Sequence, residues 1–236
     1  MVSVCMATFN GSVFILDQVR SILSQLSDTD ELVISDDSST DNTLDLIKAI
    51  GDARIILIEK KTFRNPVLNF ENALRNARGE IILLSDQDDI WLENKIDTLK
   101  NHLTQCDLVT TDCKIVSHEL RILSESYLSL VNGKTGFIRN LLKTSPYMGC
   151  CMGFNRKVLE RSLPFPPSIP MHDFWIAMVA EAFYQPRIIY EPFVLHRRHD
   201  QNTSSTGQKS KNSFLNKLLL RKNILIPLLK LAWRNR

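Results

Sequence analysis

The sequence predicts an α/β protein with a doubly wound, mostly parallel central sheet flanked by helices. Over about the first ninety residues, short apolar runs alternate with segments of helical periodicity. Polar clusters directly follow three of the apolar runs, at the sheet edge where such proteins bind ligands. The composition is 44% hydrophobic and 23% charged, which is that of a globular chain and excludes a mostly disordered one.

The regular first part of the chain supplies four strands and three helices. Apolar runs rich in β-forming residues predict strands over residues 2–7, 31–35, 54–58 and 80–85. Helical spacing of apolar residues predicts helices over residues 12–26, 41–49 and 69–77. Ser39 or Thr40 can cap the second helix, with Asp41 in its first turn, and Gly79 marks the end of the third.

The later part of the chain is less regular. We expect helices over residues 92–102, 156–163 and 173–183, a loop and helix within 127–144, and strands within 107–115 and at 187–190. Residues 149–155 are apolar and end a loop. The expected organisation is one domain over residues 1–203, a polar linker over 204–212 and a basic amphipathic segment over 213–236.

Charge and cysteine content narrow the functional classes. Residues 209–236 hold eight basic and no acidic residues, which leaves 21 basic against 26 acidic residues elsewhere. An acidic body does not suit nucleic acid, whereas a basic tail suits an anionic surface. The five cysteines form no CxxC pair, which is typical of reduced thiols in the cytoplasm. Neither a secretory signal nor a run of about 20 apolar residues is visible.

The chain lacks the glycine-rich loops that cradle phosphates in Rossmann dinucleotide-binding and P-loop proteins. Carboxylates holding a divalent cation are the alternative, and Asp86-Gln87-Asp88-Asp89 offers them after a strongly apolar run. Clustered carboxylates repel one another unless a cation compensates them, and Mg²⁺ or Mn²⁺ binds one or two of them together with substrate phosphates. The competing interpretation is a solvated acidic turn. Asp36-Asp37 likewise predicts either a capped turn or a carboxylate that accepts from a nucleobase N–H.

Five motifs in a fixed order carry a family resemblance over about residues 2–203. They read SVCMATFNG, ISDDSSTDNT, LLSDQDDIW, GCCMGFNRKVLERSLPFPPSIPMHDFW and LHRRHDQNTS. In this order and spacing they resemble the family 2 inverting glycosyltransferases of GT-A fold, whose sheet is Rossmann-like. Within this family, the motifs resemble those of the bacterial glucosyl- and rhamnosyltransferases that build O-antigen and capsule repeat units.

The resemblance implies which residues bind the nucleotide. Thr8 and Asn10 are expected beside the nucleoside. Asp37 is expected to face a uracil or thymine, with Asp36 as its neighbour. Asp86 is expected near the ribose.

The resemblance also implies which residues carry out the transfer. Asp88 matches the ligand of a Mn²⁺ or Mg²⁺ ion on the diphosphate, and Asp173 matches the catalytic base. Asp173 precedes an apolar helix, so a helix N-cap is its structural alternative. Further contacts with the diphosphate or the acceptor are expected from Arg64, Asp89, Gly149, Cys150, His196 and His199. His172 is expected at the surface or behind the site.

The resulting functional hypothesis is an inverting, metal-dependent hexosyltransferase. A nucleotide sugar, UDP-glucose first and dTDP-rhamnose second, would donate to an undecaprenyl-diphosphate-linked saccharide at the cytoplasmic face of the bacterial inner membrane. Inversion is a direct displacement that needs a base on the acceptor hydroxyl and charge relief on the leaving diphosphate. The rivals are a catalytically silent sugar-nucleotide-binding protein and a nucleotidyltransferase, although ATFNGS lacks the glycine-rich basic loop that the latter needs.

Two positions depart from the family pattern. Relatives often have Gly where Ser38 stands, so this turn either avoids positive φ or carries a small strain. Relatives also often have a basic residue before Asn69, whereas this chain has Leu68, which leaves Arg64 to reach the phosphates.

The tail mixes apolar and basic residues over 214–233, with Pro227 interrupting the helical pattern. It either packs on the body as a C-terminal helix or lies on an anionic lipid surface. A lipid-linked acceptor favours the second.

Overall fold

The computed structural model describes residues 1–59, 61–143, 145–199 and 214–233, and for 214–220 the backbone alone. The first part of the chain forms β1 (Val2–Thr8), α1 (Ile15–Leu23), β2 (Glu31–Asp36), α2 (Thr43–Ile50), β3 (Ile55–Ile58), α3 (Pro66–Asn76), β4 (Ile81–Ser85) and β5 (Ile90–Trp91). The later part forms α4 (Lys95–Leu103), β6 (Leu108–Val116), β7 (Ile122–Ser124), α5 (Tyr127–Val131), α6 (Phe137–Leu142), the 3₁₀ turn η1 (Gly149–Cys151), β8 (Met152–Asn155), α7 (Arg156–Ser162), α8 (His172–Phe183), β9 (Pro186–Arg197) and α9 (Phe214–Trp233).

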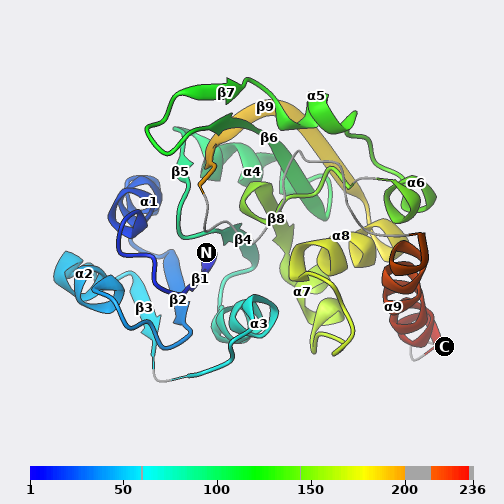
Figure 1. The fold of residues 1–236 in the computed structure, drawn as a ribbon, viewed down its shortest axis with the longest axis horizontal. Helices are drawn as coiled ribbons and strands as arrows, with labels where there is room; N and C mark the ends of the chain where they lie inside the picture. Colours follow the sequence, from blue (N-terminus) through cyan, green and yellow to red (C-terminus); the bar gives the residue numbers. More distant parts are fainter. Residues whose placement is uncertain (60, 144, 200–213, 234–236) are drawn as a thin grey trace.

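One curled sheet runs through the molecule in the order β3-β2-β1-β4-β8-β6-β9-β5, with β7 on the outside of β6 (Figure 1). The strands β1 to β4 are parallel, and β6 and β9 run in the same direction. The strands β5, β7 and β8 run the opposite way. The sheet is therefore mostly parallel, which confirms the predicted fold class.

Helices cover both faces of the sheet, because the strands are apolar on both. In β1, Val4 and Met6 belong to the core shared with α1, α2 and α4, whereas Cys5 belongs to the core shared with α3, α7, α8 and α9. A strand buried on both faces reads as a continuous apolar run rather than an alternating one. This is why the first four strands are visible in the sequence.

Several boundaries differ from those that the sequence predicts. The helix α2 begins at Thr43, so Asp41 lies before its first turn and instead accepts hydrogen bonds from the backbone N–H groups of Ser12 (3.1 Å) and Thr43 (3.0 Å). The strand β9 extends seven residues beyond the predicted 187–190, to Arg197, and β5 was not predicted. The predicted linker over residues 204–212 lies outside the described residues.

The helix α9 continues through Pro227 and packs against α8, with Ile224 and Leu228 buried in the same core as α8. The packing expected of a C-terminal helix is therefore present. Among the described helices, none combines the length and the apolar content needed to cross a bilayer.

Candidate active site

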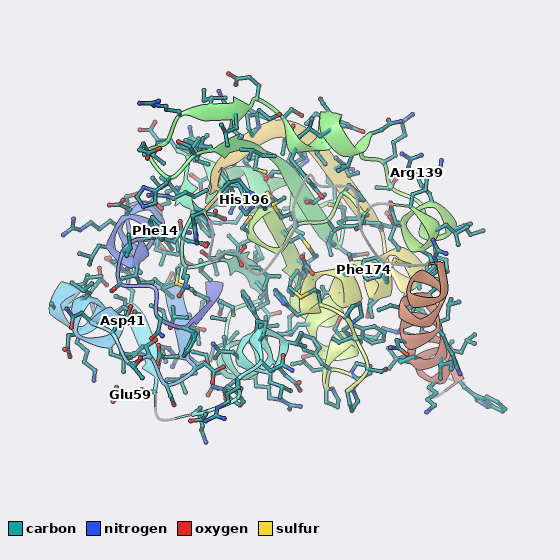
Figure 2. All side chains as sticks on the ribbon, in the orientation of Figure 1. Phe14, Asp41, Glu59, Arg139, Phe174 and His196 are labelled. Atoms are coloured by element: carbon teal, nitrogen blue, oxygen red, sulfur yellow. The ribbon has the colours of Figure 1, made fainter. Side chains whose placement is uncertain are left out.

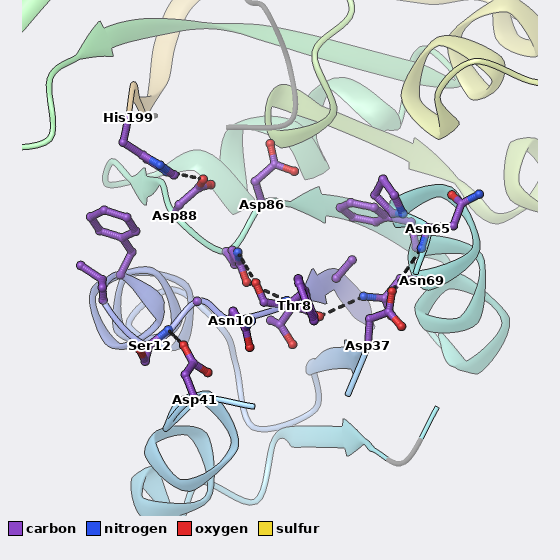
Figure 3. A pocket seen from close by; sticks show the side chains of 18 of the residues that line it. Thr8, Asn10, Ser12, Asp37, Asp41, Asn65, Asn69, Asp86, Asp88 and His199 are labelled. Carbon is purple, nitrogen blue, oxygen red and sulfur yellow. Dashed lines mark hydrogen bonds and ion pairs between the residues drawn. The ribbon is translucent and has the colours of Figure 1, made fainter. Parts of the chain in front are cut away.

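A cavity of about 800 Å³ lies beyond the carboxyl ends of β1, β2 and β4 (Figure 3). Eight of the thirteen expected site residues line it: Thr8, Asn10, Asp37, Arg64, Asp86, Asp88, His196 and His199. Asp36, Asp89, Gly149, Cys150 and Asp173 are not among the lining residues and lie behind or beside them. The parallel strand order brings the three polar clusters of the sequence to one edge, as expected.

Asp36 and Asp37 have different surroundings although they are adjacent. Asp36 is fully buried and accepts hydrogen bonds from the Thr8 hydroxyl (2.9 Å) and from the backbone N–H and hydroxyl of Ser39 (2.8 and 2.6 Å). It joins the ends of β1 and β2. Asp37 lines the cavity and accepts from the backbone N–H groups of residues 63 to 65. Only Asp37 therefore faces the space that a ligand would occupy.

Ser38 adopts the left-handed conformation, with φ at +59°. Of the two expected outcomes for this departure from Gly, the strained turn is the one observed. The Ser38 hydroxyl hydrogen-bonds to the Lys61 carbonyl and to the Thr62 hydroxyl, each at 2.7 Å. These bonds hold the left-handed turn beside Asp37.

Asn10 and Gln87 fix the loop after β1 at the floor of the cavity. Asn10 has a positive φ of 48°, and its side-chain oxygen accepts from the Thr40 N–H at 2.8 Å. Gln87 accepts from the Phe9 N–H (3.0 Å) and donates to the Phe9 carbonyl (3.1 Å). The role of Gln87 was not predicted, because a glutamine between two aspartates carries no pattern of its own.

The acidic turn after β4 places Asp86 and Asp88 in the cavity wall and Asp89 behind it. Burial and the neighbouring carboxylates Asp89 and Asp88 hold the pKa of Asp86 well above its ordinary value. Burial and Asp89 also raise the pKa of Asp88, although His199 opposes the rise. This is the electrostatic strain that a bound cation relieves.

Two histidines from the end of the sheet face these carboxylates. His199 Nε2 lies 2.8 Å from Asp88 Oδ2 in the cavity wall. His196 Nδ1 donates to Asp89 Oδ1 at 3.0 Å, and the backbone N–H of Arg197 donates to the same oxygen. Burial alone would lower the pKa of His196, but the charge of Asp89 outweighs it and raises this pKa to about 9. His196 and Asp89 therefore form a buried ion pair at neutral pH.

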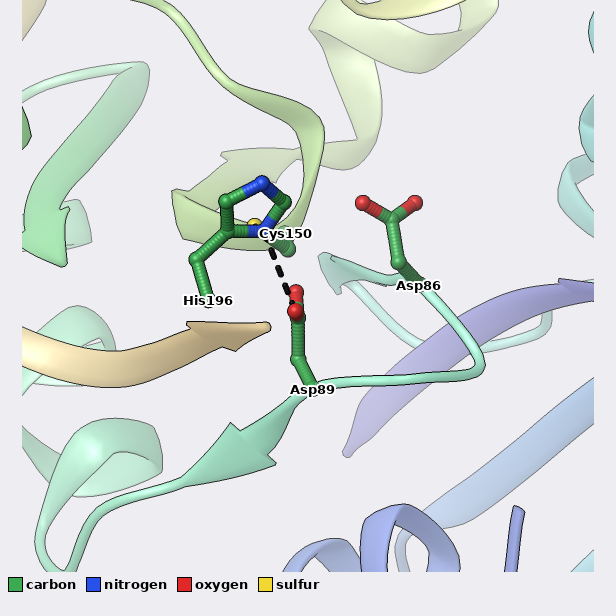
Figure 4. Close-up of side chains that lie close together, drawn as sticks. All are labelled: Asp86, Asp89, Cys150 and His196. Carbon is green, nitrogen blue, oxygen red and sulfur yellow. Dashed lines mark hydrogen bonds and ion pairs between the residues drawn. The ribbon is translucent and has the colours of Figure 1, made fainter. Parts of the chain in front are cut away.

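Several potential metal-donor atoms gather at this turn, although the ring of His196 could bind a cation only after it loses the proton that it shares with Asp89. One ligand atom from each of Asp86, Asp89, Cys150 and His196 lies within 4.8 Å of the others (Figure 4). Asp89 Oδ2 and His196 Nε2 are buried and make no hydrogen bond within the part of the chain that the structure describes. Carboxylate oxygens suit Mg²⁺ and Mn²⁺, an imidazole suits Mn²⁺, and a thiol suits softer metals. The Asp88–His199 pair offers the first two donor types and, unlike Asp89 and Cys150, faces the cavity.

The start of α8 forms another part of the wall. Asp173 lies in the first turn of α8 rather than at the N-cap, which is Met171. Its Oδ2 accepts from the Gly149 N–H at 3.1 Å, and its charge reaches Asp86. A Cβ atom at Gly149 would lie 3.5 Å from Asp173 Cβ, which is an ordinary van der Waals contact, so the backbone of Gly149 packs directly against Asp173.

His172 is expected at the surface or behind the site, but the structure shows that it is buried and lines the cavity. Its ring stacks on Phe70 with the ring centres 3.8 Å apart. Neither ring nitrogen has a hydrogen-bond partner among the described residues, and burial lowers the pKa of this imidazole. A neutral imidazole held rigidly in a cavity wall is suited to hydrogen-bond a ligand.

Lys95 is fully buried behind the acidic turn, a position that the sequence did not predict. Its Nζ donates to the Cys150 carbonyl at 2.6 Å and lies 3.6 Å above the Trp91 ring. Burial lowers its pKa to about 8. The only hint of this contact in the sequence is the spacing of four residues between Trp91 and Lys95. Because lysine is rarely buried in proteins, this spacing alone does not justify predicting a buried Lys95. Through Cys150, Lys95 supports the turn that contacts Asp173.

Comparison with known proteins gives a consistent set of matches. The family model described as Glycosyl transferase family 2 matches residues 3–163. The chain is similar to the UDP-Glc:alpha-D-GlcNAc-diphosphoundecaprenol beta-1,3-glucosyltransferase WfaP of Escherichia coli, with 40% identity over 96 residues, 41% of this chain and 38% of that protein. It is also similar to the dTDP-rhamnosyl transferase RfbG of Shigella flexneri, with 26% identity over 220 residues, 84% of this chain and 72% of that protein.

The fold has a solved counterpart in S. aureus TarS 1-349 in complex with UDP-GlcNAc. The TM-score is 0.73 at 18% sequence identity, and the match covers 97% of this chain and 66% of that one. The match with WfaP spans less than two thirds of the length of that relative. The family model covers more than half of the chain. The chain belongs to glycosyl transferase family 2 and has the GT-A fold.

Proposed function

We propose that this glycosyltransferase is metal-dependent and inverting, and that it moves glucose from UDP-glucose to a lipid-diphosphate-linked saccharide. The observation that carries the proposal is that Asp88, His199 and the start of α8 line one cavity, with Asp173 directly beside His172 in the first turn of α8. Charge relief for a leaving diphosphate and a base for an acceptor hydroxyl are then available in one place.

The nucleoside end of the donor belongs at Asp37. Its Oδ1 already accepts from two backbone N–H groups and its Oδ2 from one, so Oδ2 retains acceptor capacity for the N–H of uracil or thymine. Thr8, Asn10 and Asp86 line the space beside it, where the ribose would lie. Arg64 also lines the cavity and supplies a cation for the phosphates.

The diphosphate end belongs at the Asp88–His199 pair. A Mn²⁺ or Mg²⁺ ion held there would neutralise charge on the departing nucleoside diphosphate. Asp88 and His199 would hold the cation, while the buried His196–Asp89 pair fixes the turn behind them. The elevated pKa of Asp88 is consistent with a carboxylate placed to bind a cation.

The transfer itself needs one proton acceptor. Asp173 takes the proton from the acceptor hydroxyl as that oxygen bonds to the anomeric carbon, and the bond from this carbon to the diphosphate oxygen breaks. The attacking oxygen enters opposite the leaving group, so the configuration inverts. The Gly149 N–H holds the Asp173 carboxylate in place for this role.

Glucose is the first choice of donor sugar because WfaP, which shares 40% identity in the matched segment, is named for UDP-Glc and for a GlcNAc-diphosphoundecaprenol acceptor. dTDP-rhamnose is the second, because the match with RfbG covers 84% of this chain. UDP and dTDP differ at the 2′-hydroxyl of the ribose, which only UDP carries, and at the C5 methyl group of the base, which only dTDP carries. A lipid-linked acceptor would bring the protein to the cytoplasmic face of the inner membrane as a peripheral protein.

A donor screen tests the proposal. The purified protein with Mn²⁺ receives UDP-glucose, UDP-GlcNAc or dTDP-rhamnose together with a synthetic lipid-diphosphate GlcNAc acceptor. We expect a β-linked glucoside from UDP-glucose, identified by mass spectrometry and by the anomeric proton in NMR. A product from dTDP-rhamnose alone would make dTDP-rhamnose the donor in place of UDP-glucose. An α-glucoside would contradict inversion. If a folded protein gives no product, the catalytically silent sugar-nucleotide-binding protein is favoured.

A further inference from the structure

The helix α9 has two different faces. Ile224 and Leu228 are buried against the body, on the side of α8. The opposite side of the helix is exposed and carries Lys222, Ile226, Leu229, Lys230 and Trp233. These residues follow one another at spacings of four, three, one and three, which places them along one stripe of the helix. Leu229 is 68% exposed and Trp233 is 80% exposed. Packing on the body therefore uses one face of α9 and leaves an apolar and basic face in solvent.

The short helix α6 continues this exposed face. Ile138 and Leu142, one helical turn apart, are 71% and 53% exposed. The Arg221 side chain of α9 donates to the carbonyls of Leu141 (3.2 Å) and Leu142 (2.6 Å) at the end of α6. The two helices therefore adjoin, and their exposed residues are here called the α6–α9 face: Ile138, Leu142, Lys143, Lys222, Ile226, Leu229, Lys230 and Trp233.

This face lies away from the cavity. Arg139 of α6 and the helix α9 lie at one end of the long axis of the molecule, and the cavity residues Phe14 and Asp41 lie toward the other (Figures 1 and 2). None of its apolar residues has a part in the proposed transfer, so catalysis does not account for their exposure.

Charge identifies the kind of partner. The sequence has no Asp or Glu over residues 126–159 or 209–236, whereas Lys134, Arg139 and Lys143 lie in the first segment. Glu181 of α8 reaches this side but points inward, where it accepts from the Gly136 N–H and the Tyr147 hydroxyl. A second copy of this chain would oppose these cations with the same cations, so self-association is disfavoured.

We propose that the α6–α9 face docks this protein on an anionic phospholipid bilayer. The inference rests on the proposed lipid-linked acceptor and names the surface that the protein would use to reach it. Exposed Leu, Ile and Trp side chains enter the boundary between headgroups and acyl chains, where Trp is favoured. Each nearby Lys or Arg strengthens binding to an anionic surface, and salt weakens this attraction. The occupant is a bilayer surface.

Vesicle flotation tests the proposal with matched variants. Phosphatidylcholine vesicles, with or without phosphatidylglycerol, are mixed with the protein at low and high salt. We expect the unmodified protein to float with anionic vesicles at low salt and to be released by high salt. The double variant Leu229→Glu/Trp233→Glu, and separately Ile138→Glu/Leu142→Glu, should each reduce partitioning about tenfold or more, because an apolar contact becomes a repelled anion.

The control is Ile122→Glu/Leu123→Glu on β7, where exposure is similar at 51% and 61% but the hairpin belongs to another part of the surface. This control should float like the unmodified protein. The proposal is overturned if the unmodified protein does not float with anionic vesicles at low salt. It is also overturned if the control loses as much vesicle binding as the α9 variant. Light scattering gives a third such outcome. If the unmodified protein does not bind vesicles but forms a dimer, and the α9 variant abolishes that dimer, the face binds a second copy and the proposal is overturned.

Activity separates this inference from the proposed function. Transfer to a short, water-soluble diphosphate acceptor should be unchanged in both double variants, because their residues lie outside the cavity. Loss of vesicle binding with normal transfer supports the docking face. Absence of transfer in the unmodified protein contradicts the proposed function and leaves the flotation result to be judged by itself. Circular dichroism checks folding, and the α6 variant tests the face independently if the α9 variant unfolds.

Discussion

The first 91 residues and residues 92–199 build their parts of the sheet in different ways. In the first region, β1 pairs with β2 and β4, and β2 pairs with β3, all in parallel and with a helix between successive strands. In the second region, β6 pairs with β8 and β9, and β9 reaches back to β5, where Ile90 lies opposite Leu195. The first region repeats one local unit, and the second is held by long-range pairing.

This difference separates two tasks. The first region lines most of the cavity, including Asp37 at one part of it and Asp88 at another. The second region adds the start of α8 with Asp173, and the residues that follow β9 add His199. Under the proposed function, donor binding depends mainly on the first region and transfer depends on both. Variants can therefore separate the two.

The largest effect is expected at Asp88. Asp88→Ala removes the carboxylate that would hold the cation on the diphosphate, so both donor binding and transfer should fall, with kcat/KM lower by about 10³-fold or more. EDTA should have the same effect on the unmodified protein. Asp97→Ala, at an exposed carboxylate on α4, is the control. Full transfer in EDTA would exclude a metal-dependent mechanism.

The junction between the regions depends on Lys95. The pKa of Lys95 is lowered to about 8 in the folded protein from an ordinary value of 10.5. Between these two pH values the unfolded chain binds the proton more tightly than the folded one. The free energy of unfolding should therefore rise with pH across this window. Relative to Lys95→Met, the unmodified protein should gain about 3 kcal/mol there, measured by urea unfolding. Lys100→Met, at a partly exposed lysine on the same helix, should show no such trend. A constant difference would mean that Lys95 remains charged.

Asp173 tests the second region. Asp173→Asn keeps the shape and removes the proton acceptor, so kcat should fall about 10²-fold or more. Binding of the donor, measured by calorimetry, should be retained, because the nucleotide lies against the first region. Asp45→Asn, at an exposed acid on α2, serves as the control. Normal turnover in Asp173→Asn would place the base elsewhere.

His172 tests whether the second region also contacts the donor. His172→Phe keeps the stacking on Phe70 and removes both ring nitrogens, so the melting temperature should hold while KM for the donor rises about tenfold. His172→Gln restores a donor and an acceptor and should recover part of the loss. An unchanged KM in the Phe variant would show that the ring only packs.

The smallest effect concerns Ser38, which lies wholly within the first region. Ser38→Gly relieves the left-handed strain at φ +59° but loses two hydrogen bonds. Ser38→Ala keeps the strain and loses the same bonds, so it should be less stable than the Gly variant by about 1 kcal/mol. Equal stabilities in chemical denaturation would mean that the turn relaxes.

The sequence predicts β1 to β4 well because each of these strands is a continuous apolar run and three of them end in a polar cluster. It misses β5, since a strand of two residues exists only through pairing with β9. It shortens β9, since Glu191 and Pro192 interrupt the apolar pattern where the pairing with β6 is irregular. At the site, the residue pattern alone cannot tell that Asp36 turns inward while Asp37 faces the ligand space, whereas the family resemblance does single out Asp37.

The pairing of β5 with β9 has a consequence for synthesis. During translation, β1 to β4 can pair with one another as soon as they leave the ribosome, because the pairing among these four strands uses only residues before residue 86. The short strand β5 that follows the acidic turn has no strand partner until residues 194 and 195 are made. A nascent chain would thus carry a nucleotide-sized hollow long before its carboxylates are locked in place, and the last stretch of the sheet to emerge is the one that completes the centre.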